Sequence, residues 1–119
     1  MMKKLLLALS ALSCVSAAAI AQIHTDPNAP GSQRPTLLQS ANGIPQVDIT
    51  TPSPGGVSMN QFRQFDIKPQ GVIINNGYQP SHTKLAGWVA ANPWLAGGSA
   101  SVIIHQVNNT NPSSLQGYL

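Results

Sequence analysis

Apolar positions in residues 42–119 come in short runs that asparagine, glycine or proline then interrupts. Apolar and polar residues alternate at 46–49 and again at 62–67, which predicts strands with one buried and one polar face. The continuous apolar run at 72–74 is typical of a strand buried on both faces. Residues 100–107 form the clearest expected strand. The pattern as a whole predicts a chain that makes brief strands and then turns.

Turn and break signals separate these strands. The Asn-Gly pairs at 42–43 and 76–77 favour turns, because both residue types tolerate positive φ. The stretch 51–56 is rich in proline and glycine and cannot continue a ladder. The propensity of 85–91 allows a short helix, but a central glycine and a proline just beyond it favour a strand or irregular structure. A further strand is expected to begin at 115–119.

Short strands joined by turns rich in asparagine and glycine predict an all-β fold. Our first interpretation is a right-handed parallel β-helix, of which the chain holds the N-terminal rungs and cap in incomplete form. Each rung of such a helix buries its face under the next, and asparagine side chains stacked at the turns bond one another along the axis. The alternative is an antiparallel β-sandwich, which gives the same short strands and turns.

Residues 1–21 predict a cleaved signal peptide. Two lysines precede an apolar segment, and Ala19-Ile20-Ala21 supplies the small-x-small pattern that signal peptidase accepts, with cleavage before Gln22. The apolar segment is short for a membrane-spanning helix, which needs about 20 apolar residues. A lipoprotein signal ending at Cys14 is a minor alternative, because the usual leucine is missing three residues before that cysteine. A cleaved signal peptide implies export by the Sec machinery and contact with signal peptidase.

Residues 22–40 hold three prolines and show no hydrophobic period. They predict an extended or disordered leader, with 36–38 as the part that docks on the domain. Residues 41–119 are assigned to the expected β-helical domain, which the chain holds only in part. Removal of 1–21 leaves 98 residues without cysteine, so disulfides and thiolate metal ligands are excluded.

The charge of the chain argues against a nucleic-acid partner. The formal net charge is +3, but two of the six basic residues belong to the expected signal peptide. The remaining charged residues are Arg34, Arg63, Lys68 and Lys84 against Asp26, Asp48 and Asp66. The mature net charge is therefore about +1 with no basic stripe, which gives no electrostatic footprint for nucleic acid.

No group of side chains has the spacing of a catalytic or metal site. The chain offers three histidines and three aspartates, and none matches a set of nucleophile, base and orienting group or a zinc motif. His105 is expected in an outward-facing or rung-edge position. Asp48 and Asp66 are expected on the solvated polar faces of strands. The sequence therefore predicts no enzyme activity, no cofactor and no metal.

Two tryptophans are candidates for a sugar-stacking platform. Tryptophan is usually well buried, so the favoured interpretation places Trp88 in the core and Trp94 over a turn. The alternative leaves both rings exposed as a carbohydrate-binding surface.

Four stretches, at 42–49, 58–67, 71–77 and 92–95, occur in a recognisable order. Together they resemble the start of the secretion domain of filamentous haemagglutinin-type exoproteins. The last stretch reads Asn-Pro-Asn-Leu in that family; three of its positions match here, and Trp94 stands at the third. A second family motif, Asn-Pro-Asn-Gly-Ile, lies further downstream than this sequence extends.

The resemblance implies an N-terminal secretion domain of a large surface exoprotein, an adhesin, haemagglutinin or contact-dependent inhibition toxin of a Gram-negative bacterium. It implies unfolded passage through the periplasm, recognition by the periplasmic domains of an outer-membrane two-partner transporter, and nucleation of β-helix folding outside the cell. The product would be secreted or held on the outer-membrane surface, with a host or neighbouring cell as a further partner. The alternative is a small secreted carbohydrate-binding or structural surface protein.

Six residues are the candidates for transporter recognition or for the motif turn: Asn60, Asn75, Asn76, Asn92, Pro93 and Leu95. A proline-fixed turn between an amide and an apolar anchor is a compact recognition element. The alternative is a turn stabiliser that contacts no partner. Extended segments at 60–76 and 92–95 are expected to accept strands from the partner. The open growing end predicts that isolated residues 22–119 are marginally stable or aggregation-prone.

Overall fold

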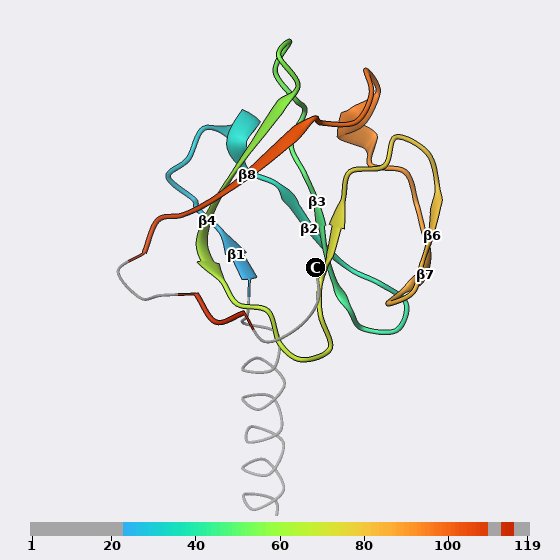
Figure 1. The fold of residues 1–119 in the computed structure, drawn as a ribbon. Helices are drawn as coiled ribbons and strands as arrows, with labels where there is room; N and C mark the ends of the chain where they lie inside the picture. The colour runs from blue at the N-terminus through green and yellow to red at the C-terminus, as the bar shows by residue number, and fades with distance from the viewer. Residues whose placement is uncertain (1–22, 110–112, 116–119) are drawn as a thin grey trace, which may run out of the picture.

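The computed structural model describes residues 23–109 and 113–115 (Figure 1). The expected signal peptide, and residues 116–119 of the last expected strand, lie outside the described residues. The strands are β1 (Ile23–Thr25), β2 (Thr36–Gln39), β3 (Pro45–Asp48), β4 (Val57–Phe65), β5 (Ile73–Asn75), β6 (Ser81–Thr83), β7 (Gly87–Val89) and β8 (Val102–Val107). Two short 3-10 helices, η1 (Gly31–Gln33) and η2 (Pro93–Leu95), join them. No helix in this part of the chain is long and apolar enough to cross a bilayer.

Two parallel strand pairs build the centre of the fold. β3 pairs with β5, and β4 pairs with β8, where Val57 lies opposite Val102. A parallel bridge between Ile67 and Leu115 continues the stacking. The chain from β3 to β4 therefore lies against the chain from β5 to β8, as successive rungs of a β-helix do. The fold is thus all-β and of the β-helix type, and its parallel pairs do not fit an antiparallel sandwich.

β1 and β2 cap the first rung. β1 runs antiparallel to β4, and β2 runs antiparallel to β3, so the backbone groups along these edges are paired rather than open. Ile23 of β1 is buried in the core. Of the extended and disordered alternatives for 22–40, the described part has extended segments, which contribute a strand to each three-stranded sheet. The docking expected for 36–38 is seen as the pairing of β2 with β3.

The second rung is longer than the first. Paired residues lie 27 positions apart in the β3–β5 pair and 45 apart in the β4–β8 pair, a difference of 18 residues. This extra length holds η2 and the β6–β7 hairpin, which stands beside β5 in Figure 1. Val89 of the hairpin packs with Ile44 and Ile73 in a small apolar cluster. The ambiguous segment 85–91 thus contains a strand, as its glycine favoured.

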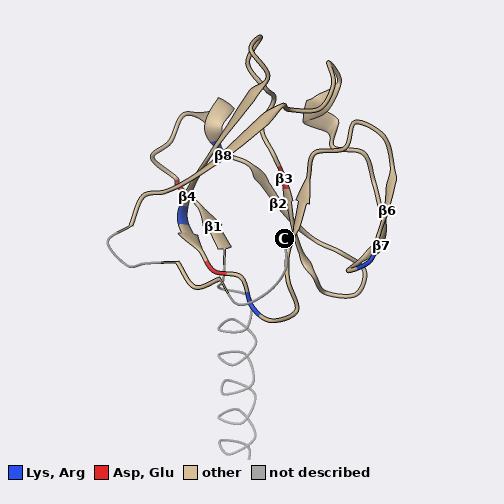
Figure 2. Cartoon of the chain, viewed as in Figure 1, with Lys and Arg blue, Asp and Glu red and all other residues tan. Residues whose placement is uncertain are grey.

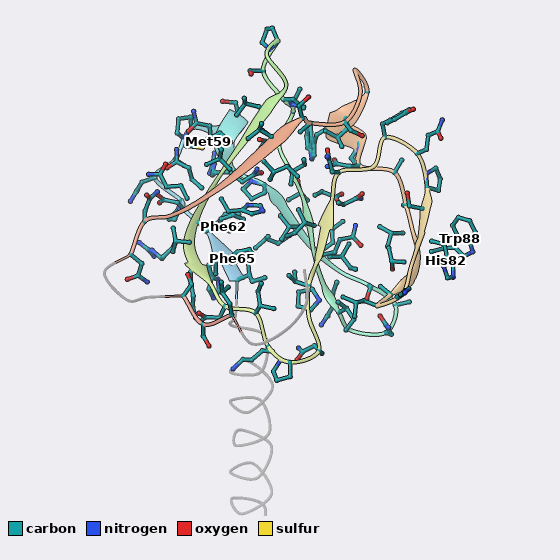
Figure 3. All side chains as sticks on the ribbon, viewed as in Figure 1. Met59, Phe62, Phe65, His82 and Trp88 are labelled. Atoms are coloured by element: carbon teal, nitrogen blue, oxygen red, sulfur yellow. The ribbon has the colours of Figure 1, made fainter. Side chains whose placement is uncertain are left out.

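The main core lies between the two three-stranded sheets. Phe62 and Phe65 of β4 meet edge to face with their ring centroids 4.8 Å apart, and Figure 3 shows both inside the ribbon. The other buried apolar members, from both rungs, are Ile23, Val47, Ile49, Ile67, Val72, Leu95 and Ala100. The core therefore joins the cap, both rungs and η2 in one cluster.

Polar residues also occupy the interior, which corrects two expectations. Asp48 is only 3% exposed, so the second face of β3 is buried under the next rung and not solvated as expected. β4 begins at Val57 and not near residue 62, because Ser58 and Asn60 face inward with Phe62 in the strand's alternation. Because these inward positions are polar, the pattern of apolar residues does not indicate this half of the strand.

Candidate functional site

Asn92 is the most completely bonded of the candidate residues. It is 2% exposed, and its side-chain nitrogen donates to the carbonyl oxygens of Ile49 and Asn75, each at 3.0 Å. Its side-chain oxygen accepts from the backbone N–H of Trp94 at 3.0 Å, as a residue capping the start of η2 does. Its own backbone N–H donates to the carbonyl of Gly77 at 2.8 Å. One amide therefore fastens η2 to both rungs.

The rest of the motif follows from this cap. Pro93 occupies the first position of η2 and is exposed, where its missing N–H costs nothing. Leu95 closes the turn with its backbone N–H bonded to the carbonyl of Asn92, and its side chain is 1% exposed in the main core. The motif thus joins a buried amide to a buried apolar anchor across one turn.

Asn75 and Asp48 stack across the rungs. They are paired positions in the β3–β5 register, and the Asn75 side-chain nitrogen donates to a carboxylate oxygen of Asp48 at 2.9 Å and to the carbonyl of Ala90 at 3.0 Å. Gln46 donates to the same Asp48 oxygen at 2.9 Å. Buried carboxylates need such donors. The contact between rungs therefore differs from the asparagine ladder expected at the turns: it joins a carboxylate and an amide at the ends of β3 and β5.

Asn60 performs a similar task at the next corner of the first rung. It is fully buried; its oxygen accepts from the backbone N–H of Thr50 at 2.9 Å, and its nitrogen donates to the hydroxyl of Ser58 at 3.0 Å. The Ser58 hydroxyl donates in turn to the carbonyl of Thr50 at 2.8 Å. The polar groups of this corner therefore satisfy one another without water.

Asn76 binds the backbone of the second rung. Its side-chain oxygen accepts from the N–H of Ala100 at 2.7 Å, and its nitrogen donates to the carbonyl of the same residue at 2.9 Å. The Asn76-Gly77 pair does not form the positive-φ turn expected, since neither residue has positive φ. Gly43 of the other Asn-Gly pair does, at 83°.

The structure thus gives the four asparagines a shared role at three places. Asn75 and Asn92 meet beside Ile49, Asn60 bonds the neighbouring Thr50, and Asn76 bonds Ala100 just before β8. Sequence reasoning missed the contributions of Thr50, Ser58 and Asp48 to this network. The signal for Ser58 was its place two residues before Asn60, on the same face of β4.

The two tryptophans are both exposed. Trp88 is 74% exposed, which overturns its expected place in the core; Figure 3 shows it pointing away from the molecule beside His82. The two rings meet edge to face at 5.4 Å between centroids. Trp94 is 51% exposed and is the middle residue of η2, so it lies at a turn and outside the core.

His105 is half-buried on the edge strand β8 and its ring faces inward, so of the outward-facing and rung-edge positions expected, the outward one is wrong. Its ring stacks on Phe65 and meets Phe62 edge to face, with centroids 5.3 and 5.2 Å away. Burial lowers the pKa of His105, because desolvation disfavours the charged imidazolium. Its Nδ1 atom has no hydrogen-bond partner among the described residues. The half-buried ring therefore packs against the two phenylalanines at the margin of the core.

The remaining ionisable groups are dispersed, as Figure 2 shows. A hydrogen bond from the Gln64 side chain, followed by one from the backbone N–H of Ser114, lowers the pKa of Asp66. The backbone N–H of Asn28, followed by the Asn108 side chain, lowers the pKa of Asp26. Within the described ranges, no three His, Cys, Asp or Glu side chains gather to hold a metal ion.

Comparison with known proteins identifies the architecture. A family model described as "TPS secretion domain" matches residues 21–119. The chain is 56% identical over 111 residues to "Toxin CdiA" of Yersinia pestis, an alignment that covers 93% of this chain and 3% of the toxin. It is 38% identical over 114 residues to "Hemolysin" of Serratia marcescens, covering 96% of this chain and 7% of that protein.

Filamentous hemagglutinin appears both as a sequence relative and as a solved structure. The protein of Bordetella pertussis is 41% identical over 83 residues, which cover 70% of this chain and 2% of its own length. The crystal structure of the filamentous hemagglutinin secretion domain matches with a TM-score of 0.66 and 34% identity, covering 79% of this chain and 29% of that one. The chain spans only a few per cent of the length of these curated relatives. It belongs to the TPS secretion domain family.

Proposed function

We propose that the periplasmic domains of an outer-membrane two-partner transporter recognise this domain, which then nucleates β-helix folding outside the cell. The match of the TPS secretion domain model to residues 21–119 carries the proposal. The upstream steps are export by the Sec machinery and cleavage by signal peptidase after Ala21. The protein is secreted or held on the outer-membrane surface, and the domain itself acts by binding rather than by catalysis.

The hydrogen bonds of the asparagines support folding after translocation. The Asn92 side chain bonds Ile49, 43 residues away, and Asn75 bonds Asp48, 27 residues away. Neither bond can form until both rungs are on the same side of the membrane. Such long-range contacts form late, which suits a chain that passes the periplasm unfolded and closes its first two rungs when it emerges.

The buried state of the asparagines bears on when the transporter reads them. Asn60, Asn75 and Asn92 are each less than 7% exposed in the folded domain, and their amides are occupied. Recognition of segments 60–76 and 92–95 would therefore act on the unfolded, extended chain, to which a partner adds strands. After export, the same residues serve the fold.

Within the described residues, the second rung ends each sheet with an edge strand, β5 in one and β8 in the other. Parallel edges of this kind accept a further rung. The domain is thus suited to template a longer β-helix, the shaft of an adhesin, a haemagglutinin or a contact-dependent inhibition toxin. A host or neighbouring cell would be the target of that longer protein.

Secretion in the presence of a cognate two-partner transporter tests the proposal. We expect the unaltered chain to reach the medium only when the transporter is present. An Asn92→Ala, Pro93→Ala double variant should lose most of its secreted yield, whereas the exposed Asn108→Ala control should retain it. Unchanged secretion of the double variant would remove the motif from the mechanism, and transporter-independent release of the unaltered chain would contradict the function itself.

A further inference from the structure

A partly open groove of about 330 Å³ lies where three segments of the fold meet. Its lining residues are Gly31, Ser32, Arg34, Thr50, Thr51 and Trp94. They come from the loop around η1, the corner after β3 and the η2 turn. The groove borders the asparagine network at Thr50 and Trp94, but none of the six candidate residues lines it.

Trp94 is held in place on this groove while its ring stays half exposed. Its indole Nε1–H donates to the hydroxyl of Thr36 at 2.9 Å, its carbonyl accepts from the hydroxyl of Thr51 at 2.9 Å, and its backbone N–H bonds Asn92. The polar edge of the indole is therefore occupied, and its apolar face is what remains for a ligand. A ring fixed in advance loses little entropy when something stacks on it.

Arg34 provides the charge. A Cβ atom added to Gly31 would lie 3.4 Å from the Arg34 guanidinium. Because Gly31 has no side chain, the guanidinium has room at this position. No acidic side chain among the residues described forms an ion pair with it. A guanidinium fork matches a carboxylate with two parallel hydrogen bonds.

We propose that this groove binds an acidic sugar, a pyranose ring that carries a carboxylate. The C–H groups on one face of a pyranose suit the negative face of an indole. The carboxylate would pair with Arg34, and ring hydroxyls would meet the hydroxyls of Ser32 and Thr51. Sites for small ligands typically combine an apolar surface with a small number of convergent polar groups. Trp94 belongs to the 92–95 turn, but its indole face and Arg34 are not among the six candidate residues, so this binding role is separate from the proposed secretion role.

The two tryptophans of the chain permit a direct binding test. In a ¹⁵N spectrum of the full chain, each indole N–H gives one signal, and Trp88 of β7, which does not line the groove, serves as an internal reference. Titration with 3′-sialyllactose and with digalacturonate should shift the Trp94 signal at about 10 mM or below, as expected of a weak site. Lactose, the neutral counterpart of sialyllactose, should leave it in place. The two acidic probes separate host-type glycans from uronate polysaccharides, and binding of either one supports the proposal.

Variants of the charge complete the test. Arg34→Gln should weaken the acidic probe about tenfold, the effect of losing a charged hydrogen bond, and Arg34→Lys should weaken it less. Both leave secretion and the urea midpoint unchanged, because the Arg34 side chain is exposed. The proposal is overturned if neither acidic probe moves the Trp94 signal, if lactose moves it equally, or if Arg34→Gln binds as the unaltered chain does.

Discussion

The η2 turn and the β6–β7 hairpin both lie in the long second rung, yet they relate to the core in opposite ways. Asn92 and Leu95 of the turn are almost fully buried, and their bonds reach both rungs. Trp88 of the hairpin is 74% exposed and touches its strand partner His82. Hydrophobicity would have ranked them the other way. The comparison shows that saturated hydrogen bonding allows a polar residue such as Asn92 to be buried beside the apolar core, while an aromatic residue such as Trp88 stays exposed.

The largest effect is expected when the turn loses its amide. Asn92→Ala removes three side-chain hydrogen bonds and leaves two buried carbonyl oxygens without that donor, so the free energy of unfolding should fall by about 2–4 kcal/mol. Urea unfolding measures the change. Asn108→Ala is the control, because Asn108 also makes three side-chain hydrogen bonds but is exposed; it should cost about 0.5 kcal/mol. Equal effects of the two variants would contradict a special contribution of the buried Asn92 amide to stability.

A second test concerns the contact between turns of successive rungs. Gly56 has φ of 85°, and a Cβ there would lie 2.9 Å from the hydroxyl oxygen of Ser101. Gly56→Ala should therefore cost about 1–3 kcal/mol of unfolding free energy through backbone strain and displacement of that residue.

Gly55→Ala is its matched control. No positive φ is recorded for Gly55, and the nearest atom to an added Cβ is 3.8 Å away. This change should be neutral to within about 0.5 kcal/mol. If thermal or urea melts show the two glycine variants to be alike, the turns of the two rungs are not stacked as described.

The third expectation is a dependence of stability on pH. His105 has a folded pKa below its ordinary value of 6.5, so the unfolded chain binds the proton more readily. Its contribution is fully present above pH 6.5 and is lost as the pH falls from there through the folded pKa. Urea midpoints measured from pH 7.5 to 5 should fall, and His105→Phe should reduce the slope. An equally steep fall in that variant would assign the dependence to other groups.

The smallest effect is expected on the hairpin. Trp88→Ala removes a side chain that is mostly in water, so the free energy of unfolding should change by about 0.5 kcal/mol or less. Its circular dichroism spectrum and urea midpoint should match those of the unaltered chain. A loss of 2 kcal/mol or more, as for a buried aromatic, would show that the hairpin folds back onto the body.

The periodicity of apolar residues was sufficient to predict the all-β class and several strands. Alternation and apolar runs located β3, β5 and β8, because their inward residues are largely apolar. The order of the four sequence stretches was sufficient to indicate the family. The same signal failed for the first half of β4, where Ser58 and Asn60 face inward, and for β1, a three-residue strand that depends on pairing with β4.

Long-range partners explain the remaining errors. Asp48 is buried because Asn75 and Gln46 supply donors, and no local pattern reveals a donor 27 residues away. Trp88 is exposed because its hairpin presents one face to water, although the residue type favours burial. Recognition of the six candidate residues by a transporter, and the aggregation of isolated 22–119, stay predictions.

Hydrogen exchange of three backbone amides tests the central claim most directly. The N–H groups of Thr50, Trp94 and Ala100 each donate to a side-chain oxygen, of Asn60, Asn92 and Asn76 respectively. If these asparagines fasten the rungs, the three amides should exchange as slowly as those inside β4, since only opening of the fold exposes them. Exchange at the rate of exposed loop amides would contradict an interior role for the asparagines.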